Sequence, residues 1–318
     1  MRSNRTKLII LAVISIICII LFAFYDIKGG FDYAFPKRLV RIGAMVVTGI
    51  AIAYATVVFQ TITHNRILTP SVMGIDSMYE VVQTFIYFFA GSVSIFVVNQ
   101  YLNFGLAMAA MVLFALLLYR FLFRADKHPI FFILIIGLII GTLLGSFVTF
   151  LQVLISPTEY LSLQNVLFAS FINIKSEILY LAVGILIISF LYGYRMMRKL
   201  DVMSLGRDNS INLGINYDRM VMKTLILSSI LIATSTALVG PITFLGLIVA
   251  NLSYQFLPTY KHVTLIIGAS LISIIALVGG QFIVEHLLEM KTTISVIINF
   301  VGGIYFIYLL LKESKAIG

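Results

Sequence analysis

Long apolar runs separated by short polar loops fill almost the whole of this sequence. Ten of these runs approach the roughly 20 apolar residues that a membrane-spanning helix needs: residues 8–25, 39–61, 79–98, 101–123, 129–155, 177–197, 220–239, 241–257, 263–284 and 294–311. The runs 79–98 and 241–257 show the weakest pattern. The pattern predicts an all-α polytopic membrane protein, in which residues 1–318 form one transmembrane domain of about ten helices.

The composition agrees with this prediction. Of the 318 residues, 61% are hydrophobic and 11% are charged, whereas soluble domains carry about 25% charged residues. A net charge of +9 is also found in nucleic-acid-binding proteins, but no basic run or nucleic-acid motif accompanies it, so no nucleic-acid partner is expected. The one cysteine, Cys18, permits no disulfide within the chain.

The positions of the cations predict the orientation of the chain. When the N-terminus is placed inside, most of the 22 lysines and arginines fall in inner loops or at the ends. Lys and Arg collect in cytoplasmic loops, and ten crossings place both termini on one side. We therefore expect both termini in the cytoplasm, with residues 198–219 as the longest polar stretch on that side.

Gly and Pro interrupt the apolar pattern at two corresponding places. Pro70 and Gly74 precede the third run, whereas Gly240, Pro241 and Gly246 lie at the start of the eighth. A broken helix in lipid leaves backbone groups unpaired, so such breaks lie where protein or a water-filled path covers them. Paired breaks in halves of opposite orientation are also typical of inverted repeats around a transport path. The pattern thus permits an inverted repeat, with chance as the competing explanation, and it predicts that the second break lies inside the bundle.

Small residues recur at every fourth position of the fifth run. Gly137, Gly141 and Gly145 share one helix face, and the polar Gln152 follows them. Small residues at this spacing let two helices approach closely. Two interpretations remain open: the face forms a seam with a second subunit beside the transport path, or it packs within this chain.

Five blocks carry a resemblance to a known family: Arg38–Arg41 with Gly49 and Gln60, His64–Gly74, Met203–Gly214, Gly240–Val249 and Gly302–Leu310. In this order they resemble the permease subunits of ATP-driven importers for ferric siderophores, haem and vitamin B12, the FecCD-like type II importers. The chain departs from that pattern where Ala250-Asn251 replace a usual Pro-His and Tyr254 stands near a usual Arg. These departures indicate a divergent branch that imports iron chelates.

The resemblance implies a fold like that of the vitamin B12 importer permease, in the bacterial cytoplasmic membrane. It implies that the chain pairs with a second copy or a sister permease, and that two cytoplasmic ATPases hold ATP and Mg²⁺. No cofactor or metal is expected on this chain itself. A substrate-binding lipoprotein would dock from outside on Arg38, Arg41 and Lys291, because Arg binds carboxylates in a bidentate manner. The alternative for these cations is contact with lipid phosphates.

The resemblance also assigns roles further along the chain. Residues 198–219 become the segment that couples to the ATPase, through Ser204, Leu205, Gly206, Asp208, Ser210, Leu213 and Gly214. We expect a short helix capped by Ser204 and ended by Gly214 in a left-handed turn. Nearby Asp201, Arg207, Asp208 and Arg219 are expected to form a salt-bridge cluster. The expected path and helix-packing residues are Gln60, Gly137, Gly141, Gly145, Gln152, Gly240, Pro241 and Gly246.

No enzyme signature occurs in the sequence. A G-x-x-x-x-G-K-[ST] phosphate loop is missing, so the energy for transport must come from a partner. An ion-coupled secondary transporter is the rival interpretation, and it requires a titratable residue in mid-membrane. Asp76, Glu80 and Lys223 are instead expected near inner helix ends. The predicted function is therefore import of a ferric siderophore, with haem or vitamin B12 as alternative cargoes.

The remaining metal-ligand residue types carry no strong pattern. Glu285, His286 and Glu289 lie close together in the sequence, but no further ligand accompanies them, so a solvated loop edge is expected. His64, His128 and His262 each lie at an expected inner loop. We interpret them as interfacial residues rather than metal ligands.

Overall fold

The structure, a computed structural model, describes residues 3–26, 31–123, 130–172, 174–290 and 292–317. Within these ranges all regular structure is helical. In chain order the elements are α1 Asn4–Phe24, α2 Phe31–Thr63, η1 Ser71–Met73, α3 Ile75–Ala90, α4 Ile95–Val98, α5 Gln100–Phe123, α6 Ile130–Leu154, α7 Pro157–Leu167, α8 Ser176–Tyr194, α9 Met197–Met203, α10 Arg207–Asn212, α11 Tyr217–Val239, α12 Leu245–Phe256, α13 His262–Ile274, the π-helical turn η2 Ile275–Gly279, α14 Gly280–His286 and α15 Ile294–Ile317.

Each of the ten predicted runs contains a helix, but two of these helices are short. Eight helices in the described ranges are long and apolar enough to cross a membrane, when α13, η2 and α14 are taken as one. The other two runs hold α3, with 16 residues, and α12, with 12 residues. The prediction of one helix over 79–98 is wrong, because α3 starts earlier and ends before Gly91, whose φ of 75° suits only glycine without strain. The number of crossings stays a prediction.

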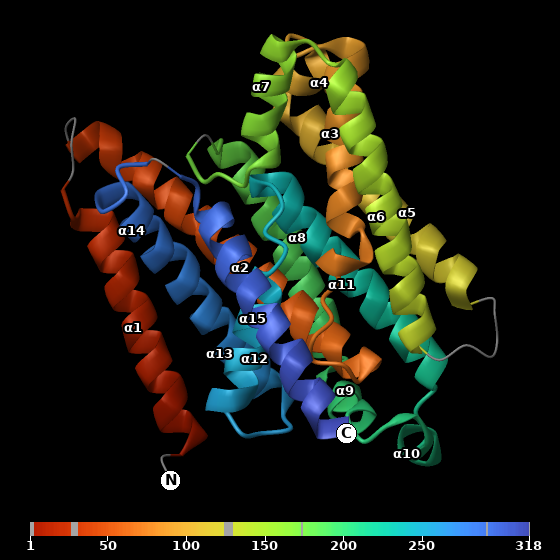
Figure 1. Cartoon of the computed structure of the whole chain (residues 1–318). Helices are drawn as coiled ribbons and strands as arrows, with labels where there is room; N and C mark the ends of the chain where they lie inside the picture. The colour runs from red at the N-terminus through yellow and green to blue at the C-terminus, as the bar shows by residue number, and fades with distance from the viewer. Residues whose placement is uncertain (1–2, 27–30, 124–129, 173, 291, 318) are drawn as a thin grey trace.

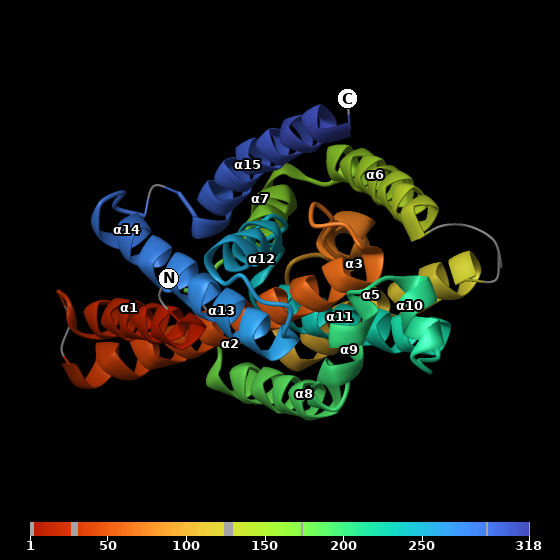
Figure 2. The same cartoon turned by 90° about the horizontal axis from the view of Figure 1, so that it is seen from below.

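Two helices form the centre of the molecule. In α2, 83% of the most apolar stretch is buried, and in α11 72%, compared with 22–28% for α1, α5, α6, α8 and α15. Small residues of α2, among them Ala44, Ala51 and Ala55, are completely buried. They let neighbouring backbones approach closely, as helix packing in lipid requires. Figure 2 shows α2 and α11 between α8 on one side and α3 and α12 on the other.

The two ends of the molecule differ in what they carry. Figure 1 shows both termini at the same end as α9 and α10, whereas α4, α7 and α14 lie towards the opposite end. The shared position of the termini is what an even number of crossings predicts. We call the end with α9 and α10 the inner end, following the orientation that the loop charges predict.

The chain between α2 and α3 turns back into the molecule. Gly74 has a φ of 88°, and a Cβ added there would lie 2.9 Å from the Cα of Gly141 in the middle of α6. A Cβ on Gly137 would lie 3.2 Å from the Met73 side chain. For these two positions packing within the chain is therefore the correct interpretation, and α3 begins at mid-depth. Gly145, in contrast, has nothing within 4 Å of an added Cβ.

We predict that Gly141→Ala lowers the stability of the protein by about 1–3 kcal/mol, the usual cost of overpacking. The new Cβ would lie 3.1 Å from the Cα of Gly74, and backbone cannot yield as a flexible side chain does. Thermal unfolding in detergent measures the effect. Gly145→Ala is the matched control on the same helix and is expected to leave the midpoint unchanged or raise it; equal midpoints for both variants would contradict the packing described above.

Candidate functional site

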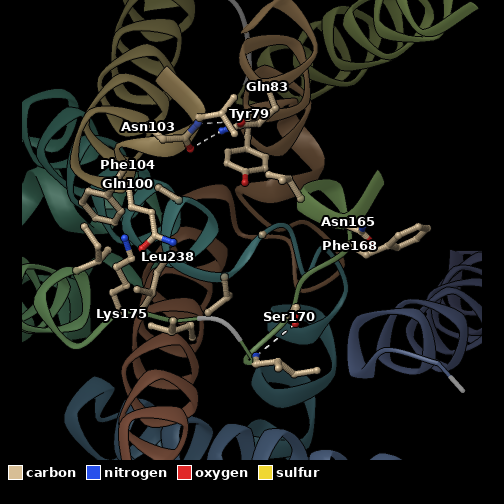
Figure 3. Close-up of a pocket in the computed structure, with 18 of the residues that line it drawn as sticks. Tyr79, Gln83, Gln100, Asn103, Phe104, Asn165, Phe168, Ser170, Lys175 and Leu238 are labelled. Atoms are coloured by element: carbon tan, nitrogen blue, oxygen red, sulfur yellow. Dashed lines mark hydrogen bonds between the residues drawn. The ribbon is translucent and has the colours of Figure 1, made fainter. Parts of the chain in front are cut away.

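A cavity of about 620 Å³ lies at the outer end of the molecule. Its walls come from α3, α5, the loop between α7 and α8, and the last turn of α11 (Figure 3). Tyr79, Gln83, Tyr87 and Phe104 line it and are at most 4% exposed. No Asp or Glu is among the described residues of the lining, whereas Lys175 contributes a positive charge. The cavity therefore suits a ligand with anionic oxygen atoms and apolar or aromatic faces.

Two groups of polar side chains stand out in the lining of the cavity. Gln83 and Asn103 satisfy each other, with Nε2 to Oδ1 at 2.9 Å and Nδ2 to Oε1 at 3.1 Å. In Figure 3 the Tyr79 hydroxyl, the Gln100 amide and the Lys175 ammonium point into the open space. No hydrogen bond of these three side chains is found within the described part of the chain. All three are hydrogen-bond donors, and they are free to bind a ligand.

The Gly240-Pro241 break lies beside this cavity. Gly240 lines the cavity with a φ of 98°, and an added Cβ would lie 2.9 Å from the Cα of Ala169. The amide of Ser170 donates to the carbonyl of Val239 at 2.9 Å, and Pro241 is buried. The loop between α7 and α8 thus covers the break, as lipid-exposed irregular backbone would require. Gly246 fits equally tightly against Thr56 of α2.

Asp76 corrects one sequence-based expectation. This carboxylate was expected near an inner helix end, but it is 5% exposed and accepts a 2.9 Å hydrogen bond from Thr236, close to the outer end of α11. The reason is the inward turn before α3, which places the start of that helix at mid-depth. The side chains of Ser71 and Thr243 interact with the same carboxyl group. Asp76 therefore joins the two Pro-Gly breaks, and Oδ2 has no partner of hydrogen-bonding geometry.

Gln60 holds the inward turn from α2. Its Nε2 donates to the carbonyl of Arg66 at 2.7 Å, and Asn251 of α12 donates to the same carbonyl at 2.8 Å. The guanidinium of Arg66 lies 4.8 Å from the ring centre of Tyr254. Asn251 and Tyr254 are two of the positions at which the chain departs from the family pattern. Here they bind the backbone and side chain of the turn that precedes α3.

The arginines predicted to dock a partner are already bound within the chain. Arg38 donates to the carbonyls of Phe22, Tyr25 and Asp26 at 3.1, 2.6 and 3.0 Å, which satisfies acceptors left unpaired at the end of α1. Arg41 forms an ion pair with Glu285 of α14. Docking therefore stays a prediction, and these contacts show a role in joining α1, α2 and α14. Lys291 lies outside the described residues.

Glu285 consequently belongs to an ion pair and not to a metal site. No group of three or more His, Cys, Asp or Glu side chains in the described ranges is placed to hold a metal ion. His128 lies outside those ranges. His64 lies near the inner end with Nε2 at 3.3 Å from the Tyr217 hydroxyl, and burial lowers its pKa. His64 is therefore neutral at pH 7.

The segment expected to lie in the cytoplasm is a compact pair of short helices, α9 and α10. Gly206 precedes α10 with a φ of 97°, and Gly214 follows it with a φ of 82°, which confirms the predicted left-handed turn. The prediction that Ser204 caps the helix is wrong: Ser204 ends α9, and its hydroxyl donates to the Asp201 carbonyl at 2.6 Å. Ser210 fixes the pair, because its buried hydroxyl lies 3.2 Å from the Val202 carbonyl and 2.6 Å from that of Gly206.

The surface of this segment is unusually apolar for a polar loop. Leu205, Ile211 and Leu213 are 57%, 49% and 62% exposed. Exposed apolar side chains on a rigid support are typical of a protein-binding surface. The predicted four-residue salt-bridge cluster is wrong, because Arg207 pairs with Asp218 at 3.4 Å and Asp201 turns inwards to His262. His262 is therefore buried rather than interfacial, and sequence reasoning missed it because its partner lies 61 residues away.

Comparison with known proteins agrees with this arrangement. The model of the FecCD transport family matches residues 12–312 of the chain. The chain belongs to the FecCD transport family. It is 51% identical to the petrobactin import system permease protein YclO of Bacillus subtilis (strain 168), over 98% of this chain and 99% of that protein. It is 35% identical to the petrobactin import system permease protein FatC of Bacillus anthracis, over 87% of this chain and 78% of that protein.

A solved structure shows the same fold. A metal-chelate type ABC transporter in an inward-facing conformation superposes with a TM-score of 0.82 at 22% identity, covering 98% of this chain and all of that one. The FecCD resemblance and the fold inferred from the five sequence blocks are thus confirmed. The chain is a multi-pass protein of the cytoplasmic membrane, and a transport component rather than an enzyme.

We predict that Arg41→Ala destabilises the protein by about 3 kcal/mol, because the buried Glu285 keeps its hydrogen bond from Gln281 but loses its oppositely charged partner. The two side chains are only 13% and 8% exposed. The exchanged pair Arg41→Glu with Glu285→Arg should recover part of the loss in thermal unfolding. Reduced affinity for a binding protein at unchanged stability would show instead that Arg41 acts at the outer surface.

Proposed function

We propose that this chain is one permease subunit of an ATP-driven importer that carries a ferric siderophore into the cytoplasm. The exposed apolar surface on the rigid α9–α10 pair is the observation that carries the proposal, since it gives a membrane protein without a phosphate loop a place to bind an ATPase. Two ATPase subunits would hold ATP and Mg²⁺. The buried Asp76 at mid-depth meets the requirement of an ion-coupled transporter for a titratable residue, but such a transporter does not need this apolar surface.

The relatives favour a siderophore of the petrobactin kind as the cargo. YclO and FatC are both named for petrobactin import and match most of this chain. A cobalamin import permease, BtuC of Halobacterium salinarum, is 25% identical over 88% of the chain. Vitamin B12 is therefore a weaker alternative than petrobactin, and haem stays an alternative as well.

A sister permease is a better candidate for the second subunit than another copy of this chain. In Bacillus anthracis the names FatC and FatD both designate petrobactin import permeases, and this chain is 35% and 29% identical to them. In Bacillus subtilis the names YclO and YclN likewise both designate petrobactin import permeases, and this chain is 51% and 26% identical to them. Two distinct permeases with one named cargo support a heterodimer. An extracytoplasmic binding protein would deliver the cargo to the pair.

The outer cavity is the part of this chain that best suits the cargo. Ferric siderophores present anionic oxygen atoms around the metal, and those with catechol groups also present aromatic rings. Tyr79, Gln100 and Lys175 supply donors for such oxygens, and Phe104 supplies an apolar wall. The adjoining Gly240 break would let the cavity change shape as α11 and α12 move.

Removal of apolar surface from α10 tests the proposed function. We expect Leu213→Glu to abolish copurification of the ATPase and ATP-dependent uptake of radioiron-labelled petrobactin, because it removes an apolar contact that is 62% exposed. Asn212→Glu adds the same charge to the neighbouring exposed position without removing an apolar side chain, and it should retain both. Uptake that persists without the ATPase would refute the ATP-driven importer.

The cavity is tested by a substitution that removes one hydroxyl. Tyr79→Phe should raise the KM for ferric petrobactin uptake several-fold, because the buried hydroxyl that points into the cavity is lost. Tyr180→Phe, at a residue of α8 that is 72% exposed, is the matched control and should leave KM unchanged. An unaltered KM in Tyr79→Phe would exclude this hydroxyl from cargo binding.

A further inference from the structure

A buried line of hydrogen bonds joins the cytoplasmic helix pair to two membrane helices. Oδ1 of Asp201, on α9, accepts from the backbone amide of His262 at 2.8 Å and from its Nδ1 at 2.6 Å. The Nε2 of His262 lies 2.7 Å from the Thr61 hydroxyl, in the last turn of α2. The His262 side chain is 2% exposed and that of Asp201 24%. We call these three residues the Asp201–His262–Thr61 joint.

Asp201 supplies the hydrogen-bond acceptor that the N-terminus of α13 lacks. The first amides of a helix have no partner within the helix, and a nearby carboxylate satisfies them and interacts favourably with the helix dipole. The residue at the N-cap of α13, Lys261, makes no side-chain capping bond. Asp201 caps α13 from a different helix, so α9 and the start of α13 share one set of hydrogen bonds.

The joint continues into the centre of the molecule through α2. Because Nδ1–H of His262 donates to Asp201, the single proton of the Thr61 hydroxyl is donated to Nε2, and the carbonyl of Val57, 2.9 Å away in α2, is its alternative acceptor. On the other side, α9 is anchored by Leu200 and Met203, which are completely buried, and Ser210 ties it to α10. The segment that carries the exposed Leu205 and Leu213 is therefore connected to α13 and α2 by directional bonds as well as by apolar packing.

Directional bonds matter for transmission of movement. Apolar surfaces can slide past one another with little change in contact area, whereas a hydrogen bond weakens steeply outside a narrow range of distance and angle. Bonds that involve a carboxylate are shorter and stronger than neutral ones. A displacement of α9 along the membrane surface is thus passed to α13 through Asp201 and His262 and is not lost by slippage.

We propose that Asp201 and His262 are positioning residues that transmit the ATPase-driven movement of α9 and α10 to α13 and α2. The proposal rests on the proposed ATP-driven function. Asp201→Ala and His262→Ala each lower uptake at least tenfold in proteoliposomes holding the whole importer with its binding protein. ATPase copurification is unchanged and basal ATP hydrolysis stays within twofold, so the number of ATP molecules used per iron rises. His262→Asn keeps a donor near the Nδ1 position and recovers part of the uptake.

Asp218→Ala is the matched control. Asp218 is another aspartate at the inner end, and its ion pair with Arg207 is exposed, with side chains 63% and 70% accessible. Exposed pairs contribute little, so this variant transports at the wild-type rate. Uptake and coupling unchanged in Asp201→Ala and His262→Ala would overturn the proposal, as would equal losses in Asp218→Ala.

A cross-link separates transmission of movement from simple stabilisation. In a Cys18→Ser background, which removes the one native thiol of this chain, Asp201→Cys and His262→Cys are combined. The reduced protein is uncoupled, a short bifunctional methanethiosulfonate restores uptake, and dithiothreitol abolishes it again. Uptake that stays lost after cross-linking, with the importer still assembled on size-exclusion chromatography, would overturn the proposal. A wild-type importer without ATP-dependent uptake would instead overturn the proposed function, and the joint with it.

Discussion

The structure depends on one constraint: irregular backbone inside a membrane must find its partners within the protein. The chain breaks its helices before α3 and before α12, and each break is covered by an element from elsewhere in the sequence. Gln60 and Asn251 bind the first turn at Arg66, and the α7–α8 loop binds the second at Val239. Asp76 then connects the two, through Thr236 on one side and its own helix start on the other. The interior around these two breaks is therefore a place where three distant segments must meet.

Three charged side chains at the ends of the bundle bind other helices of the same chain. Arg38 satisfies carbonyls at the end of α1, Arg41 pairs with Glu285, and Asp201 caps α13. Arg38 joins two consecutive helices, whereas Arg41 and Asp201 join helices that are far apart in sequence. All three lie at an end of the bundle, where a helix leaves backbone groups unpaired. By contrast the inner-end surface that would meet an ATPase carries the exposed Leu205 and Leu213 beside the exposed Arg207–Asp218 pair.

Periodicity and loop charge predicted most of the helices, because a spanning helix leaves a long uniform signal. The blocks around Gly206 and Gly240 also identified the family. What the sequence could not show is depth: Asp76 and His262 look like loop-edge residues, and only the path of the chain places them against Thr236 and Asp201. Ser204 looked like a helix cap because its residue type fits, but Gly206 takes that place with a φ of 97°. A local sequence pattern predicts a helix, whereas a contact between distant residues depends on how all the intervening helices pack.

The glycine face of α6 divides into two halves with different surroundings. Gly137 and Gly141, in its first half, pack closely against Met73 and Gly74 of the same chain. A Cβ added at Gly145 would have no other atom within 4 Å. Substitution in the first half disturbs the start of α3 directly. Substitution at the second half meets no contact inside the subunit, so it is limited only by whatever molecule covers that surface. One helix thus carries two separate packing constraints, the first set by this chain's own turn before α3 and the second by the molecule that covers Gly145.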